Sequence, residues 1–99
     1  MSKVCVFATL WIATAAKDHV LAELLAHQAR CLSDEPGTLI FELMLPRDTA
    51  EAAHIYEVYE DQEAFNVHWT GASMAELKRA TGDNLRIVSG IWGTPISLG

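Results

Sequence analysis

The longest apolar run in the chain covers residues 4–12, and Thr9 is its only polar side chain. A strand with one face in water alternates apolar and polar residues, whereas a strand covered on both faces shows no such alternation. The run therefore predicts a strand at residues 3–12 that is buried on both faces.

A chain of 99 residues has few elements with which to cover both faces of a sheet. The chain's own helices are enough for one face of a sheet. The other face would remain an apolar patch larger than monomers usually expose, and the simplest cover is the sheet of a second copy. We therefore expect a homodimer, with the tail after Pro95 lying over a neighbour.

The next apolar pattern predicts a helix from about residue 16 to residue 32, with Thr14 as its N-terminal cap. A turn at Glu35-Pro36-Gly37 would end this helix. The apolar stripe expected on its inner face comprises Val20, Leu21, Leu24, Leu25 and Leu32.

Strands are predicted at residues 38–45 and 54–59, where apolar and β-branched residues are frequent. Asp61 would open a short helix, which Thr70-Gly71-Ala72 interrupts. Ser73 and Glu76 have the spacing of a capping box, which predicts the start of a last helix that ends near Gly82. A fourth strand is expected at residues 85–92.

The resulting order is strand, helix, strand, strand, helix, strand. This order is typical of the split βαβ, or ferredoxin-like, arrangement, an α+β fold with a four-stranded antiparallel sheet and its helices on one face. We expect residues 1–99 to form one domain, and two copies to pack sheet against sheet as a dimeric α+β barrel.

Composition narrows the range of partners. The hydrophobic fraction is 51% and the net charge is −6, with seven scattered basic residues. Nucleic acid and anionic membranes are therefore not expected as partners. Lys3 and the apolar run after it resemble a short signal peptide, but the charge is a single Lys and cleavage would remove the strand. Cys5 and Cys31 are interpreted as free thiols, which favours a location in the reducing cytoplasm.

His68 is the first candidate for catalysis. On a helix it shares the inward side with Phe65 and Trp69, and a histidine there could take a proton from a phenol. The alternative is a core histidine bonded to a backbone carbonyl. The acidic residues from Glu57 to Asp61 are interpreted as a solvated strand end.

Several further residues are candidates for substrate binding. Gln28 falls near the middle of the first helix's apolar stripe, where a buried amide needs a ligand, a water or a strand carbonyl as partner. Aromatic side chains could form the walls around a flat ligand or simply belong to the core. Asn66 could bond to the ligand or lie at the solvated surface. The aromatic candidates are Phe7, Phe41, Tyr56 and Trp69.

No nucleotide motif or metal-ligand spacing is recognised, and His19, His27 and His54 lack a partner at such spacing. Strand alternation puts Tyr56 on the face opposite Glu57 and Ile55. The sequence leaves open which of these faces the pocket.

Two segments resemble the antibiotic biosynthesis monooxygenase family. The first is Glu35-Pro36-Gly37-Thr38-Leu39-Ile40-Phe41-Glu42, similar to the family pattern EPG-x-L-x-(F/Y)-E. The second runs from Tyr56 to His68 and is similar to (Y/F)-E-x-(W/Y)-x-D-x-x-A-(hydrophobic)-x-x-H. The resemblance implies a dimeric α+β barrel with a pocket between sheet and helices in each subunit.

Members of this family include cofactor-free oxygenases of quinols and phenols, haem-degrading enzymes and an isomerase of a phosphorylated sugar. The chain departs from some of them. Where many members carry a second histidine it has Ser73, and the positions used by the haem-degrading branch hold Phe7, His68 and Lys78. Trp69 lies one residue out of register with that branch.

These observations favour an enzyme that uses O₂ and no cofactor or metal to oxidise a small planar phenol or quinol, with His68 as the base. Two alternatives remain. The first is a module that binds a metabolite or haem without turnover, which the loss of the second histidine favours. The second is isomerisation of a phosphorylated sugar, for which the sequence offers no clear cluster of cations.

Overall fold

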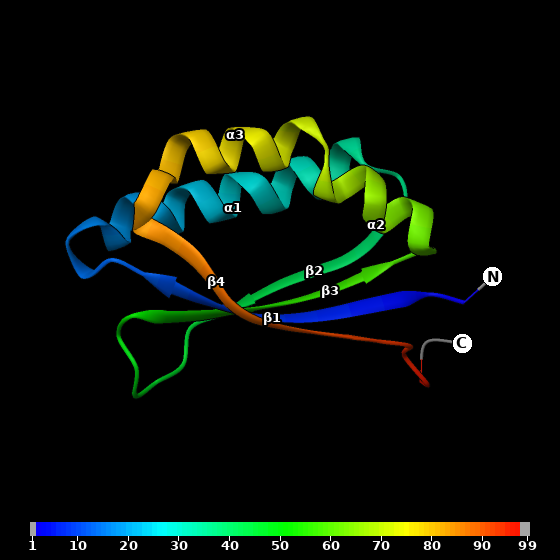
Figure 1. Cartoon of the computed structure of the whole chain (residues 1–99), viewed down its shortest axis with the longest axis horizontal. Coiled ribbons are helices and arrows are strands. Elements are labelled where there is room, and N and C mark those ends of the chain that lie inside the picture. Colours follow the sequence, from blue (N-terminus) through cyan, green and yellow to red (C-terminus); the bar gives the residue numbers. More distant parts are fainter. Residues whose placement is uncertain (1, 98–99) are drawn as a thin grey trace.

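The computed structural model describes residues 2–97. Four strands form one antiparallel sheet in the order β2-β3-β1-β4. The strands are β1 (Val4–Ile12), β2 (Thr38–Met44), β3 (Ala52–Tyr59) and β4 (Leu85–Gly93). Three α-helices, α1 (Lys17–Asp34), α2 (Gln62–Trp69) and α3 (Ala72–Thr81), cover one face of the sheet (Figure 1). This confirms the predicted ferredoxin-like fold.

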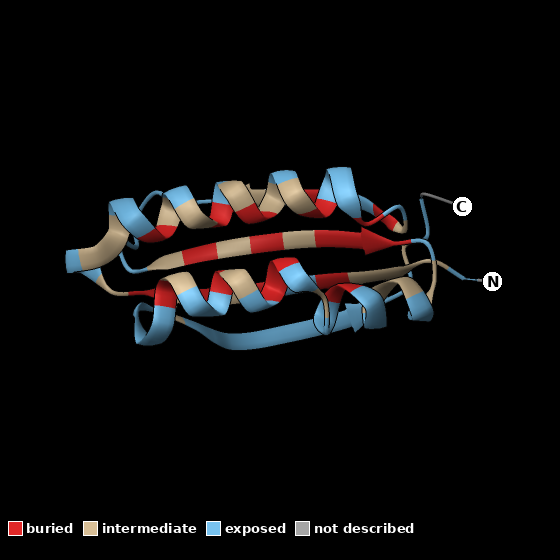
Figure 2. Ribbon diagram, turned by 90° about the horizontal axis from the view of Figure 1, so that it is seen from above, coloured by how far each residue is buried: buried red, intermediate tan, exposed pale blue. Residues whose placement is uncertain are grey.

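Strand β1 divides its side chains between two different environments. Val6, Ala8, Leu10 and Ile12 point toward the helices and are buried. The alternate positions lie on the other face, where Phe7 is 38% exposed. We call this second surface of the sheet the open face. Figure 2 shows the buried residues gathered between the sheet and the helices, with β4 exposed at one edge.

Helix α1 buries a different stripe from the expected one. Val20, Leu24, His27 and Cys31 are each no more than 1% exposed. Leu25 and Leu32 are instead 58% and 46% exposed, so their assignment to the inner face is wrong. The buried positions follow the steps i, i+4, i+7 and i+11 of a 3.6-residue period. The inner face of α1 therefore carries aliphatic side chains in its first half, and His27 and Cys31 in its second half.

The helix starts agree only in part with the sequence. Asp61 caps α2 as predicted, because its Oδ1 accepts a hydrogen bond from the Ala64 amide at 2.9 Å. Thr14 does not cap α1, since Ala16 is the capping position and the Thr14 hydroxyl donates to Glu51.

The predicted capping box of α3 is also wrong. Gly71 is the capping residue and makes no side-chain cap, and α3 begins at Ala72. Ser73 lies within the first turn, where its buried hydroxyl accepts a hydrogen bond from Arg30 Nε at 2.8 Å. The Ser73 hydroxyl, which the predicted capping box uses as the cap, therefore bonds to Arg30 on α1 instead.

The turn after α1 brings the C-terminal end of α1 close to α2. A Cβ atom added to Gly37 would lie 2.4 Å from the Cβ of Ala64 on α2, so only glycine allows this approach. The approach fixes Glu35, just before the turn, against α2. Among residues 2–97, no helix is long and apolar enough to cross a membrane.

Candidate functional site

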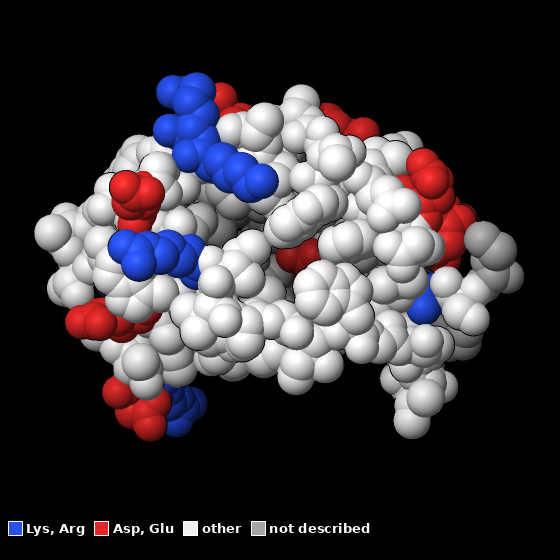
Figure 3. All heavy atoms as spheres, in the orientation of Figure 1, with Lys and Arg blue, Asp and Glu red and all other residues white. Residues whose placement is uncertain are grey.

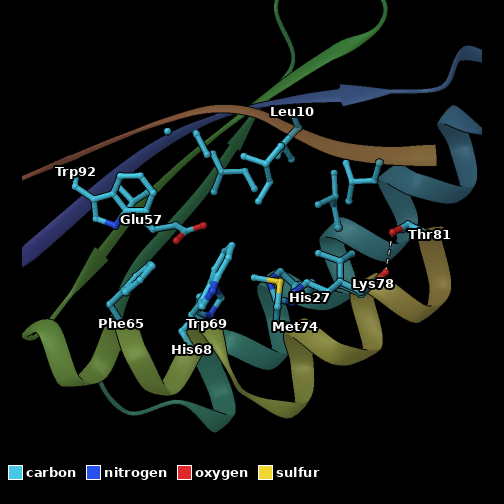
Figure 4. A pocket seen from close by; sticks show the side chains of 18 of the residues that line it. Leu10, His27, Glu57, Phe65, His68, Trp69, Met74, Lys78, Thr81 and Trp92 are labelled. Atoms are coloured by element: carbon cyan, nitrogen blue, oxygen red, sulfur yellow. Dashed lines mark hydrogen bonds between the residues drawn. The ribbon is translucent and has the colours of Figure 1, made fainter. Parts of the chain in front are cut away.

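A pocket of about 370 Å³ lies between the sheet and the helices. Its walls are mostly apolar, and Figure 3 shows it as a hollow with atoms of an acidic residue at its floor, surrounded by residues that are neither acidic nor basic. The acidic residue that lines it is Glu57. The pocket is therefore mostly apolar. His68 and Glu57 lie at the end where α2 faces β3, whereas Lys78 and Thr81 line it from α3 (Figure 4).

His68 forms part of this polar end. The side chain is 1% exposed, and its Nδ1 lies 2.9 Å from Glu35 Oε1. The same carboxylate oxygen accepts a hydrogen bond from Thr38 Oγ1 at 3.0 Å. A carboxylate can only accept, so Nδ1 carries the proton. In the neutral ring the lone pair is then on Nε2, and the hydrogen bonds of His68 among residues 2–97 are made by Nδ1. His68 itself lines the pocket.

Glu57 is the second polar group of the pocket. Tyr59 donates a hydrogen bond of 2.5 Å to its Oε1, and the Glu57 carboxyl group points into the pocket (Figure 4). Burial raises the pKa of Glu57 above its usual value, although the Tyr59 hydroxyl acts in the opposite direction. The prediction of a solvated Glu57 is wrong, because the residue is 7% exposed.

Aromatic rings line the mouth of the pocket. Phe65 and Trp69 on α2 stack at a centroid distance of 6.0 Å, and Trp92 on β4 meets Phe65 edge-on at 6.0 Å. Lys78 Nζ lies 5.3 Å from the centroid of the Trp69 ring. The mouth therefore offers flat surfaces to a planar ligand, with one cation beside them.

Only some of the predicted site residues line the pocket. His68 and Trp69 line the pocket as expected. Phe41 is buried behind them, 6.2 Å from the His68 ring, and Gln28 donates to its backbone oxygen at 2.7 Å. The partner of Gln28 is therefore the strand carbonyl, one of the three alternatives.

The other predicted binding residues lie away from the pocket. Tyr56 pairs with Phe7 across the strands, and both lie on the open face. The pocket instead receives their neighbours Ile55 and Glu57. Asn66 is exposed on α2, where its side chain accepts a hydrogen bond from Gln62.

A buried cluster of titratable side chains lies behind His68. Cys31 Sγ is 3.6 Å from His27 Nδ1 and Nε2 and 3.5 Å from His68 Nδ1. Burial, with the nearby charges of His68 and Arg30, lowers the pKa of His27 to about 4. Burial and Glu35 raise the pKa of the Cys31 thiol to about 12. At neutral pH both groups are therefore uncharged.

Three residues of this site are not among those predicted from the sequence. The sequence places Glu35 in a turn, Glu57 at a solvated strand end and Trp92 in a strand. One signal was available, because His27 and Cys31 are one helical turn apart and so share a face. Nothing local to α1 could show that His68 of α2 joins them.

The family of the chain follows from a comparison with known families. The family model described as "Antibiotic biosynthesis monooxygenase" matches residues 3–80. The chain therefore belongs to this family. No curated protein matches the chain.

Solved structures with the same fold come from several bacteria. A protein of Bacteroides thetaiotaomicron, provisionally assigned to the same family, has a TM-score of 0.88 and 20% identity, over 96% of this chain and 90% of that one. A similarly assigned protein of Nitrosomonas europaea has a TM-score of 0.86 and 13% identity, over 97% and 92%. A protein of Mycobacterium tuberculosis has a TM-score of 0.83 and 22% identity, over 96% of both chains. At these identities the likeness establishes the fold.

Proposed function

We propose that the protein is a cofactor-independent monooxygenase that oxidises a small planar phenol or quinol. The observation that carries this proposal is the His68–Glu35 pair, in which Nδ1 contacts the carboxylate while His68 lines a mostly apolar pocket with aromatic walls. We infer that Nε2 of the neutral ring is then unprotonated and available to a substrate. A histidine oriented in this way by a carboxylate is suited to act as a general base.

The proposed reaction begins with transfer of a phenolic proton to His68 Nε2. The substrate anion gives one electron to O₂, and the resulting radical and superoxide join at a ring carbon. Protonation gives a hydroperoxide, and loss of water from that carbon leaves a carbonyl. One oxygen atom enters the product and the other leaves as water. The protein supplies orientation, exclusion of water and control of protons.

Glu57 has a separate role in this proposal. Its raised pKa favours the neutral carboxyl group, and Tyr59 already donates to Oε1. The carboxyl proton is then on Oε2, from which it can be donated to a substrate or peroxide oxygen. Two buried groups with opposite proton preferences, His68 as acceptor and Glu57 as donor, suit a reaction that moves a proton across the ring.

The open face supports a proposal about assembly. Large apolar side chains remain exposed on it, including Phe7 at 38%, Met44 at 52% and Ile91 at 69%. Exposed large apolar side chains on one face are typical of an interface. A homodimer formed through the open face would leave the pocket on the helix-covered face free for substrate. We also expect a reducing compartment such as the cytoplasm, since Cys5 and Cys31 are free thiols.

The two alternatives fit this pocket less well. An isomerase of a phosphorylated sugar needs cations, whereas the residues lining the pocket include Lys78 as a cation and the acid Glu57 at the floor. A binding module without turnover is favoured by one observation. The position of the family's second histidine, Ser73, bonds to His27 and Arg30 and does not line the pocket.

Oxygen uptake with a panel of quinols and polycyclic phenols tests the proposal. We expect turnover by the wild type, and a loss of about 10²–10⁴-fold in His68→Ala, the usual contribution of a general base. Asn66→Ala is the matched control on the exposed side of α2 and should keep the full rate. Equal rates for wild type and His68→Ala would remove His68 from the mechanism. A ligand that binds and is recovered unchanged would favour the binding module.

A further inference from the structure

We propose that His27, Cys31 and His68 bind one zinc-like transition-metal ion behind the pocket. The three side chains are no more than 1% exposed, and one potential ligand atom from each lies within 4.8 Å of the others. His27 and Cys31 come from one turn of α1, and His68 comes from α2. Imidazole and thiolate ligands together are typical of zinc, and of cobalt used as its probe.

The distances match those between ligands that share a metal ion. Zn–S bonds of about 2.3 Å and Zn–N bonds of about 2.0–2.1 Å, at tetrahedral angles, place sulfur and nitrogen roughly 3.5–3.6 Å apart. Cys31 Sγ lies 3.6 Å from the His27 ring nitrogens and 3.5 Å from His68 Nδ1. Both sulfur–nitrogen edges of the tetrahedron are therefore already formed.

The surroundings supply the remaining parts of such a site. Glu35 Oε1, at 2.9 Å from His68 Nδ1, is the nearest oxygen for the fourth position. Ser73 Oγ lies 2.8 Å from His27 Nδ1, so it can hold that nitrogen as N–H and turn Nε2 toward the ion. A divalent ion bound to one thiolate and one carboxylate is neutral overall, which lowers the cost of burying it beside the Arg30 guanidinium.

A second cavity lies beside the residues that surround the cluster. Glu35 and Ser73 line it, together with Arg30, Gly71 and Glu76, whereas His27 and His68 line the main pocket. Because Glu35 also bonds to His68, it links the cluster to the second cavity. On binding, the Cys31 thiol releases its proton to solvent, and the proton of the neutral His68 ring passes from Nδ1 to Nε2.

Cobalt binding to the purified full chain tests this inference without any turnover. With a non-chelating reductant present, we expect one Co²⁺ per chain, an intense near-ultraviolet thiolate-to-cobalt band and the visible bands of a tetrahedral site. Added Zn²⁺ should displace the cobalt and erase these bands. Cys31→Ser should lose the near-ultraviolet band, whereas Cys5→Ser, the matched control on the open face, should keep it.

Circular dichroism shows whether each variant is folded. If Cys31→Ser does not fold, His27→Asn serves instead and should lose the tetrahedral visible bands. Zn²⁺ should also raise the thermal midpoint of the wild type, because the site exists only in the folded chain. A folded wild type without a thiolate band, or a band that depends on Cys5, would overturn the proposal. A metal ion on His68 Nδ1 puts the proton of the neutral ring on Nε2, so the metal-bound form cannot use Nε2 as a base. Oxygen uptake by the metal-free chain therefore tests that role separately.

Discussion

The two faces of the sheet are built from the same strands but have different uses. On the helix-covered face, alternate residues of β1 and β3 pack against α1 and α3 and leave a pocket with His68 and Glu57 at one end. On the open face the intervening residues remain partly exposed, and the polar ones pair with each other. Thr9 bonds to His54 at 3.1 Å, and Arg86 lies 4.9 Å above the Trp11 ring. We propose that chemistry belongs to one face and assembly to the other.

A pair of phenylalanines gives the largest expected difference between the faces. Phe41 is 1% exposed beneath the helices, whereas Phe7 is 38% exposed on the open face. Phe41→Ala should lower the free energy of unfolding by about 3–5 kcal/mol, because it leaves a cavity in the core. In dilute protein, where any dimer has dissociated, Phe7→Ala should cost much less. Chemical denaturation of both variants measures this, and equal losses would contradict the division between the faces.

A charge on the open face should affect assembly more than folding. Ile91 is 69% exposed there, and we expect Ile91→Glu to convert a dimer into a monomer of 10.9 kDa, since a buried carboxylate without a partner opposes association. Leu25→Glu, at a 58% exposed position of α1, is the control and should remain dimeric. Sedimentation at micromolar concentration measures both. A wild type that is already monomeric would exclude the proposed dimer.

The smallest expected effect is the pH dependence that Glu57 adds to stability. Because burial raises its pKa above 4.5, the folded chain binds more protons than the unfolded chain between the two pKa values. The contribution of Glu57 to the free energy of unfolding is therefore present at low pH. It declines as pH rises from the unfolded pKa to the folded pKa. The free energy of unfolding of Glu57→Gln should lack this decline. It should therefore rise relative to that of the wild type as pH increases. Denaturation curves across a pH series measure it, and a constant difference between the two proteins would argue against the buried titration.

The fold was predictable because period-2 and period-3.6 patterns are local properties of the chain. The apolar run at residues 4–12, the turn at Pro36-Gly37 and the Asp61 cap were enough to place most elements. The errors came from polar groups with distant partners. Ser73 has the spacing of a cap but bonds to α1, and the buried stripe of α1 includes His27 and Cys31 in place of Leu25 and Leu32.

The candidate site was less predictable for the same reason. His68 and Trp69 could be placed because they share one face of a short helix. Glu57 could not, since strand alternation says only that it lies opposite Tyr56, and the choice of face depends on which residues the helices cover. The partnership of His68 with Glu35 joins residues far apart in sequence and requires the close contact of Gly37 with Ala64.

We propose that Glu35 holds the proton of His68 on Nδ1 and leaves Nε2 as a base for the substrate in the pocket. Nitrogen-15 NMR of histidine-labelled protein, with His68→Asn used to assign the signal, reads the tautomer directly. In the metal-free chain we expect neutral His68 to carry its proton on Nδ1, and Glu35→Gln to disturb this preference. A neutral His68 with its proton on Nε2 in that sample would exclude Nε2 as the base.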